Sequence, residues 1–381
     1  MTIKTSSPTA VLHTGLLAAA LMAAAAGPVQ ACTSILLPAK DGAYVYGRTM
    51  EFALPLRSQL VIIPRNYRIT ATGPAAPVVG QGGMTWQTKY AAVGANALGL
   101  PILVDGVNEK GLAGGQFNFP GYAEFQKAPP GEEGKSIASF ELVTYLLTSF
   151  ATVEEVKAAL PGIYVTEGKL KQFGDMPSPY HLSIHDAAGK SIVIEYTQGG
   201  QLHVYDNPTH VLTNSPDFPY QLANLAQYQY LTADIVPPLK AGSTSLAAPS
   251  SGDGMNGLPG GFLAPARFVR AFFAQQNAPP LDDAAAAVQM SFHLMGGLEL
   301  PPGSIKTSAK GGGEGGGVDG YEITEWTAAA DLRNGRYYIR TYTNPDVRMV
   351  DLQKADLNAA AITVIPLDQP QVIRDLTGDA R

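Results

Sequence analysis

The sequence predicts an α+β fold in which β-sheets pack between layers of helices. Strand-like segments come first along the chain, helical segments dominate its middle, and strands return near the end. This order is typical of sheets covered by separate groups of helices. With 41 Gly and 29 Pro among 381 residues, we expect many turns and loops between these elements.

Composition narrows the class of protein further. Hydrophobic residues make up 45% of the chain and charged residues only 15%, which is typical of a compact protein with a large core. The formal net charge of -6 gives no basic surface for nucleic acid, so no nucleic-acid partner is expected. Length alone suggests about two domains.

Residues 1–31 are predicted to be a secretory signal peptide. Lys4 precedes an apolar stretch over 11–26, Gly27-Pro28 ends it, and Val29-Gln30-Ala31 is a cleavage site of the A-x-A type. The apolar stretch is shorter than the roughly 20 residues that span a membrane. We therefore expect cleavage after Ala31, no stable membrane insertion afterwards, and an exported protein in the periplasm or outside the cell.

Cys32, the only cysteine, directly follows this cleavage site. Such a lone thiol is buried and inert, intermolecular, or reactive. Cleavage would place a thiol and a free α-amine on one residue, and an amine with a pKa of about 8 can take the thiol proton at neutral pH. This pairing is the minimal equipment of an N-terminal nucleophile hydrolase. A lipoprotein signal also puts cysteine after the cut, although Val29 and Gln30 fit such a signal poorly.

The first elements after Cys32 are predicted to form a hairpin. Residues 32–37 read as a buried strand, Lys40-Asp41-Gly42 as a turn, and 43–48 as the returning strand. This hairpin would bring Arg48 level with Cys32, where a buried cation would stabilise the thiolate. Taken alone, Arg48 could equally be a surface residue at a strand end. Glu51 could orient the α-ammonium or pair with Arg48.

The rest of the chain continues the alternation of strands and helices. A Gly-rich loop at 311–317 lacks the spacing of a phosphate-binding loop, and Asn334-Gly335 predicts a hairpin turn. Further strands are expected at 59–64, 89–93, 112–120, 181–185, 192–196, 202–205, 211–216, 321–330 and 337–342, and helices at 136–150, 152–160, 219–231, 265–276 and 282–296.

Two asparagines are candidate oxyanion donors. An amide NH₂ of Asn118 or Asn214 could meet the negative charge that develops on a substrate carbonyl. Each stands shortly before a proline, so each could instead be a turn asparagine. The α-amine makes a histidine base unnecessary. His181 and His185 share one face of a strand without a cysteine or carboxylate cluster, so neither a metal nor an organic cofactor is expected.

These residues give the chain its resemblance to the choloylglycine hydrolase family, which includes bile salt hydrolases and penicillin V acylases. The matching motifs occur in the same order over most of the chain after Cys32. They are Cys32–Thr33, Gly47–Glu51, Ile63–Asn66, Asp105–Leu112, Asn118–Pro120, Leu212–Pro216 and Pro265–Phe268.

The resemblance implies one domain over 32–381 with the four-layer αββα sandwich of N-terminal nucleophile hydrolases, and it admits a homotetramer. By motif, Cys32 is the nucleophile and its amine the base, while Arg48 supports the thiolate. The same resemblance implies that Asn118 and Asn214 form the oxyanion hole and that Arg267 is a second active-site arginine. One position departs, because the family usually has Asp where this chain has Glu51.

The expected function is therefore hydrolysis of a small-molecule N-acyl amide. The motifs handle the amide and not the acyl group, so penicillin V, bile acid conjugates and acyl-homoserine lactones all stay candidates. The acyl pocket is expected from 52–58 and 66–87. The alternatives are a lipid-anchored ligand-binding protein and a family member without activity.

Overall fold

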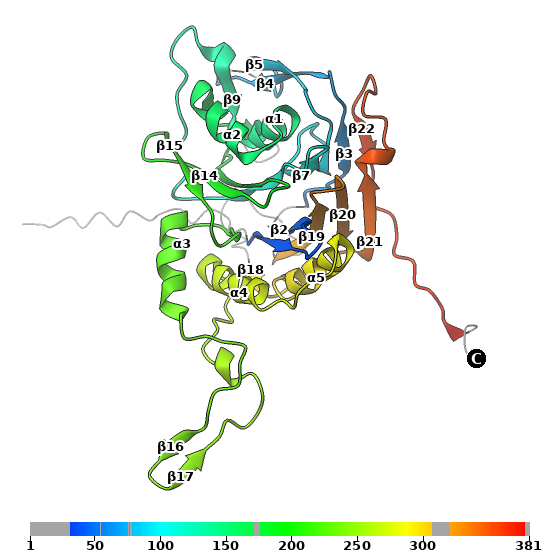
Figure 1. The fold of residues 1–381 in the computed structure, drawn as a ribbon. Helices are drawn as coiled ribbons and strands as arrows, with labels where there is room; N and C mark the ends of the chain where they lie inside the picture. The colour runs from blue at the N-terminus through cyan, green and yellow to red at the C-terminus, as the bar shows by residue number, and fades with distance from the viewer. Residues whose placement is uncertain are drawn as a thin grey trace, which may run out of the picture.

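The computed structural model describes residues 31–377, apart from 54, 75, 77, 171–175 and 307–320. The predicted signal peptide, except Ala31, and the Gly-rich loop at 311–317 lie outside the described residues. Within them, two large sheets stack face to face and helices cover both outer faces (Figure 1). The α+β sandwich predicted from the sequence is the architecture found.

The first sheet contains the predicted N-terminal hairpin. Its strands run in the order β1-β2-β19-β20-β21, and the short β18 pairs with β19. All of these pairings are antiparallel. The strands are β1 (Thr33–Pro38), β2 (Tyr44–Phe52), β18 (Ile305–Lys306), β19 (Tyr321–Asp331), β20 (Arg336–Thr341) and β21 (Asn344–Asp351).

The second sheet has eight strands in the order β15-β14-β13-β8-β7-β6-β3-β22. Its central strand β8 lies beside β13 and β7, so segments distant in sequence meet at its middle. The strands are β3 (Leu60–Ile63), β6 (Ala92–Ala95), β7 (Asp105–Asn108), β8 (Ala113–Asn118), β13 (Tyr180–His185), β14 (Ser191–Thr197), β15 (Gln201–Asp206) and β22 (Thr363–Ile365).

Helices from two parts of the chain form the outer layers. Helix α1 (Leu142–Ser149) packs against β7 and β8 with α2 (Val153–Ala159) nearby, whereas α4 (Ala264–Gln276) and α5 (Ala284–Gly296) pack against β1 and β2 (Figure 1). Helix α3 (Phe218–Leu225) packs beside α4. Gly47 allows the close approach of α5 to β2, because a Cβ there would overlap the Ser291 hydroxyl.

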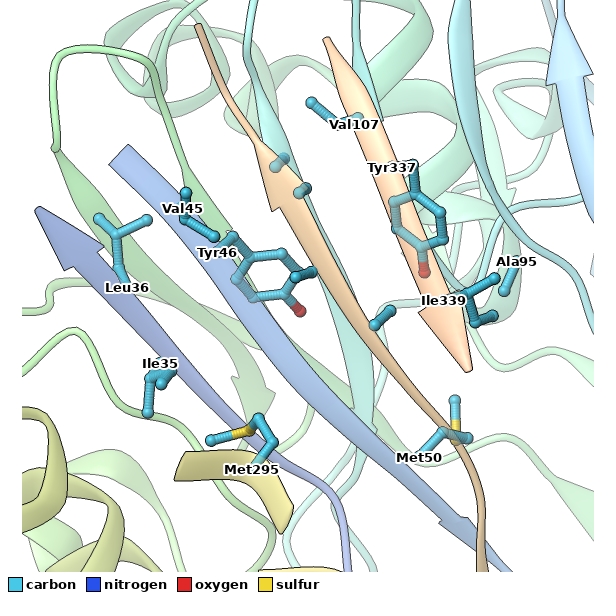
Figure 2. Close-up of a cluster of buried hydrophobic side chains, with 14 of the residues drawn as sticks. Ile35, Leu36, Val45, Tyr46, Met50, Ala95, Val107, Met295, Tyr337 and Ile339 are labelled. Carbon is cyan, nitrogen blue, oxygen red and sulfur yellow. The ribbon is translucent and has the colours of Figure 1, made fainter. Parts of the chain in front are cut away.

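Apolar side chains from both sheets fill the space between them. Figure 2 shows Tyr46 and Met50 of the first sheet in the same cluster as Val107 of the second. This inter-sheet core removes large aliphatic and aromatic surfaces from water, which is the main favourable term in folding. It also surrounds the end of β1 where Cys32 lies.

Among the described residues, four two-stranded pairs lie outside the two large sheets. Only β16 and β17 stand far from the body, on an arm that projects beyond α3 (Figure 1). The pairs are β4 (Arg68–Thr72) with β5 (Gly82–Gln87), β9 (Ser136–Ala138) with β10 (Tyr164–Thr166), β11 (Lys169–Leu170) with β12 (Met176–Pro177), and β16 (Leu239–Ala241) with β17 (Thr244–Leu246).

Several predicted boundaries were wrong. Residues 136–138 form the strand β9 and the helix begins only at Leu142, because this segment pairs with β10 before it turns. The helix predicted at 219–231 ends at Leu225. The strand predicted at 89–93 begins at Ala92, where pairing with β3 starts. Strand β2 continues through Arg48 and Glu51 to Phe52, so neither residue leaves the strand.

Candidate active site

The predicted hairpin places Arg48 beside Cys32. In its antiparallel register, Thr33 lies opposite Thr49 and Ser34 opposite Arg48. Cys32 is 1% exposed, and its Sγ lies 3.6 Å from the Arg48 Nη2 and 3.7 Å from the Met50 Sδ. The register therefore brings a cation to the thiol, as the turn at Asp41-Gly42 predicted.

Arg48 is fully buried between the sheets and not at the surface. Its Nη1 lies 3.1 Å from the Asp105 Oδ2, and its Nη2 donates to the Gln116 carbonyl at 2.5 Å. The guanidinium also stacks over the Phe117 ring, 4.4 Å from its centroid. Gly115 is required here, because a Cβ would overlap both Arg48 and Asp105.

Asp105, a residue to which the sequence assigned no role, is the ion-pair partner of Arg48. An Arg48–Glu51 pair, the alternative left open above, is wrong. Tyr46 and Tyr337 each donate their hydroxyl to the Asp105 carboxylate at 2.7 Å. Burial raises the pKa of Asp105, while Arg48 and the two hydroxyls oppose that rise. Only the packing of β7 against β2 reveals this role.

The thiol stays protonated near neutral pH unless a base is close. Burial raises the pKa of the Cys32 thiol, Arg48 lowers it, and the Glu51 charge raises it again. Arg48 therefore offsets only part of the desolvation cost. As long as Ala31 precedes Cys32, its backbone nitrogen is an amide and cannot act as that base.

Arg267 binds the main chain of Cys32 from the helical side. It lies in the first turn of α4 and is 1% exposed, and its Nη1 donates to the Cys32 carbonyl at 2.5 Å and to the Thr33 Oγ1 at 2.7 Å. Its Nη2 donates to the Asn214 Oδ1 at 2.8 Å. Arg267 thereby fixes the end of β1.

The two candidate oxyanion donors are adjacent but occupy different places. Asn118 lines a cavity that also contains the Cys32 thiol. The Asn214 Nδ2 donates to the Asn118 carbonyl at 2.9 Å, so Asn214 links Arg267 to the end of β8. The structure brings both residues to the site, with Asn118 the nearer to the cavity.

Glu51 faces the helices and not the inter-sheet space, because side chains alternate along β2. Its carboxylate accepts from the Thr49 hydroxyl at 3.0 Å and from the Thr324 hydroxyl at 2.6 Å. Burial raises its pKa to about 8, although Arg267 and the two hydroxyls oppose the shift. Glu51 thus lies near Cys32 on the side opposite Arg48.

The thiol opens into a small cavity next to a large groove. The cavity is about 20 Å³, roughly one water molecule, and Met50, Phe52, Leu56 and other apolar side chains line it. The groove is about 1100 Å³ and runs along β4 and the loops at 123–128 and 166–169. Leu100 and Ile102 line both, so they separate the thiol from the groove.

The two strand histidines, His181 and His185, have structural partners. His181 lies 3.0 Å from the Glu195 Oε1 and 2.9 Å from the Thr213 carbonyl, and His185 bridges the Ser183 and Ser191 hydroxyls. Burial lowers the pKa of His185 to about 3. Within the described ranges, no three His, Cys, Asp or Glu residues converge as metal ligands.

Comparison with known proteins identifies the family. A model of the linear amide C–N hydrolases, choloylglycine hydrolase family, matches residues 32–365. The chain belongs to the choloylglycine hydrolase family. The bile salt hydrolase/transferase of Clostridium perfringens is 32% identical over 335 residues, which is 87% of this chain and 95% of that protein.

Solved structures confirm the family fold. A variant of the conjugated bile acid hydrolase from Clostridium perfringens matches with a TM-score of 0.77 and 30% identity, over 91% of this chain and 100% of the other. The penicillin V acylase from Agrobacterium tumefaciens matches with a TM-score of 0.66 and 23% identity, over 88% and 91%. The predicted αββα sandwich and the predicted family are both correct.

Proposed function

We propose that this choloylglycine hydrolase family member is an exported N-acyl amide hydrolase that uses Cys32 as its N-terminal nucleophile. One observation carries the proposal. The lone thiol lies 3.6 Å from a buried guanidinium, at the residue where the family match begins. Placing a cation in the core is costly, and a thiolate beside it is the chemistry that would benefit.

Cleavage after Ala31 would supply the missing base. The Cys32 amine takes the thiol proton, and the thiolate attacks the amide carbonyl of the substrate. Arg48 stabilises the thiolate, and Asp105 holds Arg48 in place. Arg267, bonded to the Cys32 carbonyl, keeps the residue from rotating as it becomes the chain end.

The developing oxyanion meets amide donors at the edge of the cavity. Asn118 lines this cavity, and Asn214 is bonded to Arg267 and to the Asn118 carbonyl, which supports an oxyanion role for both. The α-ammonium then returns a proton to the leaving nitrogen, and an acyl-thioester remains on Cys32. Water hydrolyses the thioester, with the α-amine again as base.

The side chains around Cys32 are mostly apolar, which suits the start of an apolar acyl group; the cavity itself has room for only about one water molecule, so the rest of that group would lie outside it. Nine of its thirteen lining residues are aliphatic, aromatic or thioether side chains other than Tyr: Met50, Phe52, Leu56, Ala97, Leu100, Ile102, Val104, Phe140 and Leu170. Substrates of the penicillin V and conjugated bile acid type combine such a group with an amide, and acyl-homoserine lactones are the alternative within the same fold.

A panel of these N-acyl amides, read by released amine, tests the proposal. Wild type should release amine from at least one class, and Cys32→Ser, exported and processed normally, should not. A Cys32→Ser protein that hydrolyses as fast as wild type would refute the role of the thiol. Mass spectrometry of the exported protein should give a chain that begins at Cys32 and contains the free amine.

The lipid-anchored binding protein is the second candidate, and the geometry of Cys32 argues against it. A lipid on Sγ needs an exposed thiol, whereas Cys32 is 1% exposed and its Sγ contacts Arg48 and Met50. A diacylglyceryl mass on Cys32 would favour the anchor. No helix among the described residues is long and apolar enough to cross a membrane.

A homotetramer is a further proposal. The arm around β16 and β17 projects from the body (Figure 1) and exposes Ile235, Leu239 and Leu246 by 80%, 68% and 51%. Apolar side chains on a projecting hairpin are typical of a surface that a second copy covers. Light scattering on the purified protein should give four times the chain mass, and Leu239→Asp should reduce it.

A further inference from the structure

A second buried carboxyl lies on the helical side of Cys32. Glu322 of β19 is 0% exposed, and among the described residues no donor meets either of its carboxyl oxygens at hydrogen-bond geometry. It is two residues before Thr324, which binds Glu51, so Glu322 and Thr324 share one face of β19. An unpaired buried carboxylate is costly and calls for a partner.

Strand register brings Glu322 near the bond that cleavage would break, because Thr33 pairs with Thr49 of β2, and Thr324, two residues after Glu322, pairs with Glu51 of β2. The backbone N–H of Ala31 is near enough to lower the pKa of Glu322, although it is outside hydrogen-bond geometry. Neighbouring backbone nitrogens lie at most about 3.7 Å apart. The nitrogen of Cys32, which becomes the α-amine, is therefore close to the Glu322 carboxyl.

While Ala31 is present, the buried carboxyls near the Cys32 nitrogen outnumber the cations that face them. The groups that face Glu322 are Glu51 from β2, Arg267 from α4 and the end of β1 at Cys32. Burial raises the pKa of Glu322 to about 7 and that of Glu51 to about 8, even though Arg267 opposes both shifts. Two carboxyls thus share one arginine.

A new α-ammonium would correct this imbalance. It adds one positive charge and three N–H donors at a site with a carboxyl that lacks a donor. Glu51 already accepts from two threonine hydroxyls, so Glu322 has the greater unused acceptor capacity. A cation within about 4–6 Å favours the charged form of a carboxyl.

We propose that Glu322 binds the α-ammonium of Cys32 after cleavage, and so acts as a positioning residue that aims the amine at the thiol. This inference rests on the proposed function, because it needs the free amine. Glu322 exchanges no proton with the substrate in this role. Its carboxylate holds the ammonium that forms when the amine takes the thiol proton.

Competitive labelling of the α-amine tests this assignment without relying on hydrolysis. The full chain is exported as wild type, Glu322→Gln, Glu322→Asp and a control, Glu299→Gln. Glu299 is a carboxylate beside β19 that is only partly buried, and it already pairs with Arg340 and Thr327. Each protein is labelled with acetic anhydride from about pH 5 to 10, and the N-terminal peptide is quantified by mass spectrometry.

Glu322→Gln should lower the midpoint of amine labelling by about one pH unit, because a nearby carboxylate favours the ammonium. Glu322→Asp should give a smaller shift, and Glu299→Gln none. The acid limb of kcat/KM should move to lower pH in the same order. A merely structural role would lower the melting temperature and leave the labelling midpoint unchanged.

The outcomes separate the two proposals. An unchanged midpoint in an active Glu322→Gln protein that begins at Cys32 overturns this inference alone. An active wild type with any residue ahead of Cys32 overturns both. If Glu322→Gln is not processed, Glu322→Asp decides, because its retracted carboxylate must still lower the midpoint and an unchanged value refutes the assignment.

Discussion

The two faces of the first sheet differ in how their buried charges are paired near Cys32. On the side between the sheets, Arg48 and Asp105 pair at 3.1 Å and two tyrosine hydroxyls complete the carboxylate. On the helical side, Glu51 and Glu322 share Arg267. The first set is complete before any cleavage, whereas the second lacks one cation.

This difference follows from strand alternation around a single residue. Arg48 and Met50 point between the sheets with the thiol, while Thr49 and Glu51 point to the helices. The hairpin can therefore present a cation to the sulfur and a carboxylate to the nitrogen of the same residue. Each prediction below separates the two sides or removes one of them.

Removing the thiol should have the largest effect. Cys32→Ala should abolish amide hydrolysis, and Cys32→Ser should lower kcat by at least ~10³-fold, because loss of a nucleophile removes the covalent route. Both should fold like wild type, since neither deletes a large buried side chain. Steady-state kinetics and melting curves check this, and a Ser variant with full activity would contradict it.

Removing only one partner of the Arg48–Asp105 ion pair should cost much stability. Arg48→Met leaves the Asp105 carboxylate buried without its cation, which should destabilise the protein by about 3–5 kcal/mol. Adding Asp105→Asn should recover most of that loss but not the hydrolysis, because the thiolate still lacks its guanidinium. Urea unfolding and kcat/KM of the three proteins measure both parts; equal recovery of activity would show that Arg48 acts only on stability.

The buried Glu51 on the helical side of the first sheet should make the free energy of unfolding depend on pH. In an uncleaved chain, whose residues before Cys32 are retained, the folded pKa of Glu51 is about 8 against 4.5 for the ordinary group, so the folded state binds more protons between these values. Stability should then fall as pH rises from about 5 to 8, by up to ~1.4 kcal/mol per unit for one proton. Glu51→Gln should flatten this slope in urea unfolding. Equal slopes in both proteins would contradict it.

Exposed ion pairs should matter least. Lys157 and Asp206 lie 3.0 Å apart, with side-chain exposures of 33% and 82%. Because solvent screens such a pair, Lys157→Ala should change stability by less than ~1 kcal/mol and leave kcat/KM unchanged. A loss of stability as large as that of Arg48→Met would mean that burial does not explain why the two ion pairs differ in their contribution to stability.

The sequence predicted the parts of the site that depend on local order. The turn at Asp41-Gly42 fixed the register that puts Arg48 beside Cys32, and hydrophobic periodicity located α4 and α5 within two residues. The motifs also identified the family and the αββα fold. The roles of the six motif residues and the cleavage after Ala31 stay predictions.

Long-range packing accounts for what the sequence could not supply. Asp105 and Glu322 are distant from Cys32 along the chain and belong to no local pattern with it. The pairing of β19 with β2 brings Glu322 close, whereas the packing of the second sheet against the first brings Asp105 close. The sequence predicts helix at 136–138 because the apolar residues there also suit a helical face, and the strand partner β10 lies more than 25 residues away.

The most direct test of the whole account is the mass of the N-terminal peptide from active enzyme quenched in acid during turnover. The account predicts a peptide that begins at Cys32 and carries the substrate's acyl group on the thiol. Any residue ahead of Cys32 in active enzyme, or an acyl group on another side chain, would contradict it.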